Sequence, residues 1–307
     1  MTPVVISPSD IVFTSFIADA LALGPHWIYH PKELRQRFGH IMAYLPPATV
    51  YHSGKDAGNQ THYGDQTLLL LRSIAETGRF DLHHFASKWQ TFWENPDPIS
   101  YRDSATKATL SHLHAGMQPE SAGSSSTELG GTVRTAPLFL LKWENDEALF
   151  SAARALTSFT HNEPAVVEAA EFFARATLAV QRGNSISESL EKTAALPHWE
   201  AMPREWMDAA LESAASPSTD TEAIQDHGLT CHIQDAFTCV CHLLLRHPDS
   251  PITALTENIN AGGDSAARGM VLGMVYGAAF PVSTLPAAWM TDLTARVEIE
   301  GLIGKLP

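Results

Sequence analysis

Two aspartates stand where a glycine-containing segment leads into an apolar helix. Asp65 lies in residues 63–67 (YGDQT), and Asp264 lies in residues 261–269 (AGGDSAARG). Glycine permits backbone turns that other residues disfavour, and capping and the helix dipole both favour an aspartate at a helix start. Each aspartate can therefore be a simple N-cap, or the two carboxylates can meet in one pocket and perform catalysis.

Three further segments contain similar groupings of small and polar residues: 18–25 (ADALALGP), 130–138 (GGTVRTAPL) and 158–162 (SFTHN). Together with the two aspartate segments, and in this order, they resemble the motifs of the ADP-ribosylglycohydrolase family. The resemblance extends along nearly the whole chain. It implies the fold of that family and the hydrolysis of a glycosidic bond to ADP-ribose.

The resemblance also implies a pair of magnesium or manganese ions, which the family binds through threonine and aspartate oxygens. Hard divalent cations need several oxygen ligands, and this chain retains only Asp65, Thr67 and Asp264. We therefore expect either no metal or one weakly bound Mg²⁺ at Asp65 and Asp264. The family's other ligand positions are occupied here by Gly64, Gln66, Ala266 and Ala267.

Arg268 follows these altered positions. A guanidinium matches a carboxylate in bidentate geometry, so Arg268 can turn inward and pair with Asp65 or Asp264 in place of the metal charge. Alternatively, it is a surface residue of the helix predicted over Ser265–Ala279. Gly269, Gly273 and Gly277 form a stripe on this helix, which we interpret as a packing surface.

His26 stands near the place where the family often has a catalytic glutamate. Histidine titrates near neutrality, so His26 can act as an acid or base, or it can simply pack beneath Trp27 and Tyr29. We propose Asp65, Asp264 and His26 as the catalytic candidates. The expected substrate-binding residues are Asp19, Gln66, Thr67, His62, Tyr63, Arg134, His161 and Arg268.

A long polar segment, residues 45–63, leads directly into Asp65. It contains His52, Lys55 and His62, which can line a pocket for a ribose and phosphates, although a plain surface loop has a similar composition. A nucleotide-like ligand needs local positive charge, for which the candidates are Lys55, Arg134 and Arg268.

The composition favours an enzyme-sized globular domain. The 307 residues are 44% hydrophobic with a formal net charge of −14, which argues against nucleic acid or an anionic membrane as the main partner. We expect a small-molecule or ADP-ribosylated substrate. With no signal peptide and no apolar run long enough to span a bilayer, the chain is predicted to be cytoplasmic. Cys231, Cys239 and Cys241 predict ordinary cysteines rather than a zinc site or a disulfide framework.

Apolar residues recur at helical spacing along almost the entire chain, which predicts an all-α fold in one compact multi-helix domain, 1–307. The expected helices are Asp10–Leu23, Gln66–Glu76, Leu82–Trp93, Tyr101–Ala115, Gly131–Trp143, Asp146–Thr157, Glu163–Arg182, Ile186–Ala195, Arg204–Ser213, His232–Leu245, Pro251–Ile259, Ser265–Ala279 and Pro286–Thr294.

Two functions remain open at this point. The chain can be a hydrolase acting on an N- or O-glycosidic bond of ADP-ribose or a related nucleoside-sugar, with carboxylates stabilising an oxocarbenium-like transition state in a degenerate metal site. Alternatively, the site is inactive and the protein binds a ligand or is structural, as the J1-type crystallins of the same family suggest.

Overall fold

The protein is described by a computed structural model that covers residues 6–94 and 100–306. All regular elements in these residues are helices, and β pairing is limited to two isolated bridges. The predicted all-α fold is thus confirmed. The α-helices are α1 (Pro8–Leu23), α2 (Pro31–Phe38), α3 (His62–Thr77), α4 (Leu82–Glu94), α5 (Ser104–His114), α6 (Asp146–Ser158), α7 (Pro164–Gln181), α8 (Ile186–Ala194), α9 (Arg204–Ala215), α10 (Asp220–His227), α11 (Ile233–Arg246), α12 (Pro251–Ala261), α13 (Ser265–Ala279), α14 (Ala287–Thr291) and α15 (Arg296–Ile303), and the 3₁₀ segments are η1 (Val50–His52), η2 (Leu129–Leu140) and η3 (Val282–Thr284).

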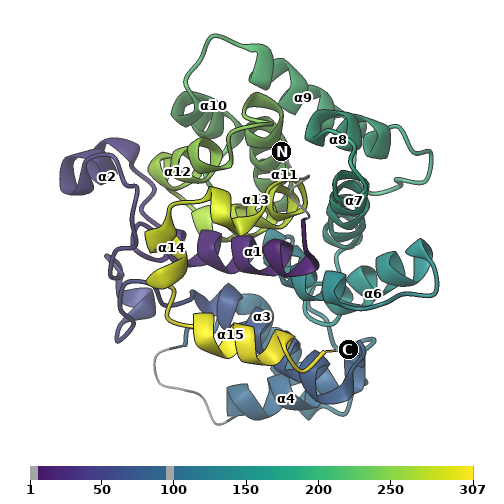
Figure 1. Ribbon diagram of the computed structural model, residues 1–307. Coiled ribbons are helices and arrows are strands. Elements are labelled where there is room, and N and C mark those ends of the chain that lie inside the picture. The colour runs from purple at the N-terminus through teal and green to yellow at the C-terminus, as the bar shows by residue number, and fades with distance from the viewer. Residues whose placement is uncertain (1–5, 95–99, 307) are drawn as a thin grey trace.

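Helices α1 and α13 form the centre of the molecule (Figure 1). A capping box between Ser7 and Asp10 starts α1, with Pro8 in its first turn. From Asp10 to Leu23 every residue of α1 is buried, and α13 is buried from Ser265 to Ala278. A helix that is apolar on all sides must be covered on all sides, which explains the ring of other helices around this pair.

The glycine stripe of α13 allows the two central helices to approach closely. A Cβ atom on Gly273 would lie 2.4 Å from the Thr14 carbonyl oxygen, and one on Gly277 would lie 2.5 Å from that of Asp10. Residues later in α13 contact residues earlier in α1, so the two helices are antiparallel. The C-terminal end of α1 therefore lies beside the N-terminal end of α13.

Several helix boundaries differ from the expectations. Helix α3 begins at His62 rather than Gln66, because the Thr61 hydroxyl accepts the Tyr63 N–H and supplies the N-cap. The short helices α2, α10 and α15 were not predicted from the sequence. None of the helices described is both long enough and apolar enough to cross a membrane.

The segment predicted as the helix Gly131–Trp143 is instead the 3₁₀ segment η2, buried from Leu129 to Phe139. Pro137 lies inside it and has no N–H to donate to an α-helical ladder. A Cβ on Gly131 would lie 2.8 Å from that of His161, so this glycine permits a close approach. The result is a tight segment that crosses the core beside α3 and α6.

Candidate functional site

The antiparallel central pair brings three distant segments together. The chain leaving α1 hydrogen-bonds to the turn before α13: Trp27 N–H donates to the Gly263 carbonyl at 3.0 Å, and Gly263 N–H donates to the Ile28 carbonyl at 2.8 Å. Gly263 has a φ of 69° and would place a Cβ 2.2 Å from the Leu229 carbonyl oxygen, so only glycine fits. The first turn of α3 completes the site.

Asp264 is both an N-cap and a buried acid. Its Oδ1 accepts the Ala267 N–H at 3.2 Å, and its Oδ2 accepts the Tyr63 hydroxyl at 2.8 Å and the Trp27 Nε1–H at 3.3 Å. His26 Nδ1 lies 3.9 Å from Asp264 Oδ1. Asp264 as a whole is only 1% exposed. Burial, followed by the Asp264 charge, holds the pKa of Tyr63 well above its usual value, so Tyr63 keeps its donor proton.

Asp65 lies in the first turn of α3 and is not an N-cap, since Thr61 occupies that position. Its Oδ2 accepts a hydrogen bond from Lys55 Nζ at 2.6 Å and from the Ser100 hydroxyl at 2.8 Å. Tyr63, two residues earlier, leaves the helix on a different side and binds Asp264. The two aspartates thus have separate partners, and a ligand shared between them stays a prediction.

Asp19 is fully buried near the C-terminal end of α1. It accepts the Thr61 N–H at 2.7 Å and the Thr61 hydroxyl. Burial nevertheless outweighs these bonds and raises the pKa of Asp19 to about 7. A Cβ on Gly64 would lie 2.3 Å from Asp19 Oδ2, so the carboxylate fills the space beside Gly64, where the family resemblance implied a threonine.

Gln66, Arg134 and His161 belong to one buried network. Gln66 Oε1 accepts the Trp89 Nε1–H at 2.8 Å and an Arg134 N–H at 3.4 Å. Arg134 also donates to the Thr160 hydroxyl, whose oxygen lies 2.9 Å from His161 Nδ1. Burial lowers the pKa of Arg134 to about 10 and that of His161 to about 3. Their expected contacts with a substrate remain predictions.

Arg268 turns inward as expected, but the predicted pairing with Asp65 or Asp264 is wrong. It is fully buried, donating through Nε to Asn258 Oδ1 at 3.0 Å and through Nη2 to the Gly262 carbonyl at 2.6 Å. Within residues 6–94 and 100–306 no carboxylate lies within ion-pair distance of it. Arg268 therefore reaches the end of α12 instead of Asp65 or Asp264.

The oxygen donors do not fit a pair of Mg²⁺ or Mn²⁺ ions. The Lys55 ammonium already neutralises Asp65, and the Thr67 hydroxyl donates to the Tyr63 carbonyl at 2.9 Å within α3. We expected Arg268 to supply the positive charge next to Asp65 or Asp264. Lys55 supplies this charge next to Asp65 instead. Asp264 contributes one carboxylate, which is too few oxygens for a hard divalent pair.

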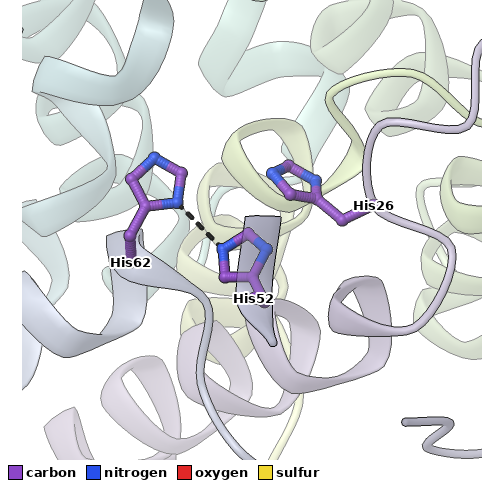
Figure 2. A group of neighbouring side chains, drawn as sticks. All are labelled: His26, His52 and His62. Carbon is purple, nitrogen blue, oxygen red and sulfur yellow. Dashed lines mark hydrogen bonds between the residues drawn. The ribbon is translucent and has the colours of Figure 1, made fainter. Parts of the chain in front are cut away.

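Sequence reasoning missed the way in which three histidines assemble. His26, His52 and His62 are fully buried and each directs a ring nitrogen toward the others, with these atoms all within 4.8 Å (Figure 2). His52 was noted only as part of the polar segment, and His62 as part of that segment and as an expected substrate-binding residue. No spacing signal could have found the group, because its members come from the loop after α1, from η1 and from the start of α3.

An aromatic cluster adjoins these histidines. Trp27, Tyr51 and Tyr101 contact one another edge to face, with ring centroids 4.9 to 5.5 Å apart. Tyr51 is 48% exposed. Trp27 has a φ of 64°, the only positive φ among the non-glycine residues described, and such strain is often found at binding sites.

Comparison with known proteins agrees with this architecture. The ADP-ribosylglycohydrolase family model matches residues 11–307, so the chain belongs to the ADP-ribosylglycohydrolase family. An uncharacterized protein of Archaeoglobus fulgidus is 25% identical over 90% of this chain and 88% of its own length. The ADP-ribosyl-[dinitrogen reductase] glycohydrolase of Rhodospirillum rubrum is 22% identical over 79% of this chain and 76% of its own.

A crystallin also occurs among the relatives. Crystallin J1B of Tripedalia cystophora is 22% identical over 90% of this chain and 88% of its own length. A solved structure titled "ADP-ribosylglycohydrolase-related protein complex" superimposes with a TM-score of 0.76, 20% identity and coverage of 97% of this chain and 95% of that one. This likeness supports the fold.

Proposed function

We propose that the protein hydrolyses an N- or O-glycosidic bond between ADP-ribose, or a related nucleoside-sugar, and its attached group. The observation that carries this proposal is the setting of Asp264: a buried carboxylate oriented by Tyr63 and Trp27 and adjoining an aromatic cluster. A carboxylate with fixed donors can activate water or stabilise an oxocarbenium-like state. The aromatic rings offer faces for stacking a nucleobase.

The catalytic assignment differs between the two aspartates. Asp264 has only neutral hydrogen-bond donors, whereas the Lys55 ammonium neutralises Asp65. We therefore assign the base to Asp264. Burial, followed by repulsion from His62 and Arg268, lowers the pKa of His26 well below its usual value, so His26 would be neutral near pH 7.

The direct test is hydrolysis of N-linked and O-linked ADP-ribose conjugates, monitored by release of free ADP-ribose. Asp264→Asn should lower the rate by a factor of about 10² to 10⁴, the usual effect of losing a general acid or base. Asp56→Asn is the matched control, because Asp56 is an exposed aspartate of the polar segment. Equal rates for the wild type and Asp264→Asn would contradict the assignment.

A second candidate is ligand binding or a structural role without catalysis. It is favoured by the burial of the site, since Asp264 is 1% exposed and Trp27 packs against it. Thermal stabilisation by ADP-ribose without turnover of any conjugate would select this candidate. Absence of both stabilisation and turnover would reject ADP-ribose as the ligand altogether.

A further inference from the structure

The three buried histidines have a donor arrangement that suits a soft or borderline metal ion. His52 Nε2 and His62 Nδ1 are 3.3 Å apart, and His26, His52 and His62 each place one ring nitrogen within 4.8 Å of a ring nitrogen of the other two (Figure 2). In a tetrahedral site with Zn–N bonds of about 2.0–2.1 Å, two coordinating nitrogens lie about 3.3 Å apart. One pair already has this separation, and the remaining nitrogen–nitrogen distances need shorten by at most about 1.5 Å to complete the set.

The hydrogen bonding of these rings is incomplete. Both nitrogens of His26, Nδ1 of His52 and Nε2 of His62 are buried without a hydrogen-bond partner among the residues described. Such atoms are rare in folded proteins, because a buried polar atom without a partner loses its solvation uncompensated.

Two carboxylates lie behind the rings on the sides that face away from the group. His62 Nε2 is 3.5 Å from Asp103 Oδ2, and His26 Nδ1 is 3.9 Å from Asp264 Oδ1. Metal-binding histidines usually present their second nitrogen to a carboxylate, which fixes the tautomer and orients the ring. Here the arrangement leaves Nδ1 of His62 and Nε2 of His26 for the metal.

We propose that His26, His52 and His62 bind one borderline divalent transition-metal ion, Zn²⁺ in the first instance. Three protein ligands leave a fourth position for water or a ligand, as in zinc sites that are catalytic rather than structural. Imidazole selects such ions over Mg²⁺, which prefers oxygen. The three ligands are not part of the aspartate and threonine motifs, although Asp264 lies behind His26, and the proposal does not depend on the hydrolase function proposed above.

The experiment begins with wild-type protein stripped by a chelator and titrated with ZnCl₂ or MgCl₂. Elemental analysis after dialysis should find about one zinc per chain, the melting temperature should rise with Zn²⁺ and not with Mg²⁺, and Co²⁺ should give the visible absorption of a tetrahedral site. His52→Gln and His62→Gln should each abolish stoichiometric binding. Asp103→Asn keeps an N-cap for α5 and should weaken zinc binding about 10- to 100-fold.

The control addresses the other histidine group of the described chain, in which His242 and His247 both contact Asp220 at 3.1 and 2.9 Å. His247→Gln should leave the zinc stoichiometry unchanged. The proposal is overturned if the wild type retains no zinc and gives no tetrahedral cobalt spectrum, or if only His247→Gln loses the metal. If a variant of the three histidines fails to fold, comparison of the cobalt spectra of wild type and His247→Gln decides the matter, because the proposal requires both to be tetrahedral.

Discussion

The three aspartates of the candidate site, Asp19, Asp65 and Asp264, have different hydrogen-bond and ion-pair partners. Asp65 has a cationic partner, Lys55, at 2.6 Å. Asp264 receives hydrogen bonds from neutral donors only. Asp19 depends on the N–H and hydroxyl of Thr61, and burial outweighs both. Residues of one type, drawn together from distant parts of the chain, therefore differ in what a change of pH or a mutation will do to them.

Asp19 should make the protein less stable as the pH rises. The pKa is about 7 in the fold and about 3.9 in the unfolded chain, so between these values the folded state binds more protons than the unfolded state. The free energy of unfolding should fall between about pH 4 and pH 7, by up to about 1.4 kcal/mol for each pH unit in this interval. The measurement is urea unfolding at several pH values.

Asp19→Asn should remove this component, because an amide does not ionise. Other groups titrate in the same range, so the informative quantity is the difference between wild type and variant at each pH. We expect the variant to gain stability relative to the wild type from pH 4 to pH 7. A difference that is constant with pH would refute the raised pKa.

Lys55→Met should leave the Asp65 carboxylate without its positively charged partner and so destabilise the fold. The Lys55 side chain is 3% exposed and that of Asp65 is 20% exposed, so the variant leaves a partly buried carboxylate without its cation. We expect a loss of about 1–3 kcal/mol in urea unfolding, less than for a fully buried pair. Added Mg²⁺ should restore part of the loss in Lys55→Met but not in Lys55→Met/Asp65→Asn. Equal Mg²⁺ responses in both variants would show that the cation binds elsewhere.

At the level of elements, the sequence predicted the long helices well and the short ones poorly. α13 has the expected bounds, because an aspartate cap starts it and its residues are apolar or small apart from Arg268 and Tyr276. α2 was missed because Leu34 is its only buried residue, so it has no apolar stripe. α10 had a usable signal, the capping box of Thr219 and Glu222, which the prediction did not use.

Gly273→Ala tests the close contact between the central helices. A Cβ at this position would overlap the backbone of α1, which cannot move without disturbing the core, and we expect a loss of about 1–3 kcal/mol or more. Gly301→Ala is the matched control. Gly301 lies in α15 with nothing near its Cβ position, so alanine should stabilise by about 0.5–1 kcal/mol. Chemical denaturation measures both, and a similar loss in both variants would contradict the packing argument.

For the molecule as a whole, the family order of motifs predicted the fold but not the contacts within the site. Asp65 was expected at a loop end, and the earlier start of α3 turns it toward Lys55. The partners of Arg268 depend on where α12 ends, and the histidine group depends on how three separate segments pack. Such contacts are set by tertiary geometry, which residue spacing in one sequence does not determine.

The C-terminal segment holds the loop that carries His52 and Lys55. Trp289 Nε1–H donates to the Met42 carbonyl at 2.9 Å, and Thr294 N–H donates to the Gly58 carbonyl at 3.0 Å. Trp289→Phe should cost about 1 kcal/mol through the lost hydrogen bond. Hydrogen exchange should become faster in residues 41–59 and stay unchanged in α7. Faster exchange throughout the protein would instead indicate general destabilisation.

The antiparallel pairing of α1 with α13 also has a consequence for protein synthesis. Ser15 donates to the Met270 carbonyl at 3.0 Å, and most of the surface that covers α1 on this side comes from α13. During translation, α1 leaves the ribosome long before α13 is made, so the growing chain carries an apolar helix without its native partner. We expect nascent chains that stop before Ser265 to associate with chaperones. The setting of Asp264 can then be complete only when translation is nearly finished.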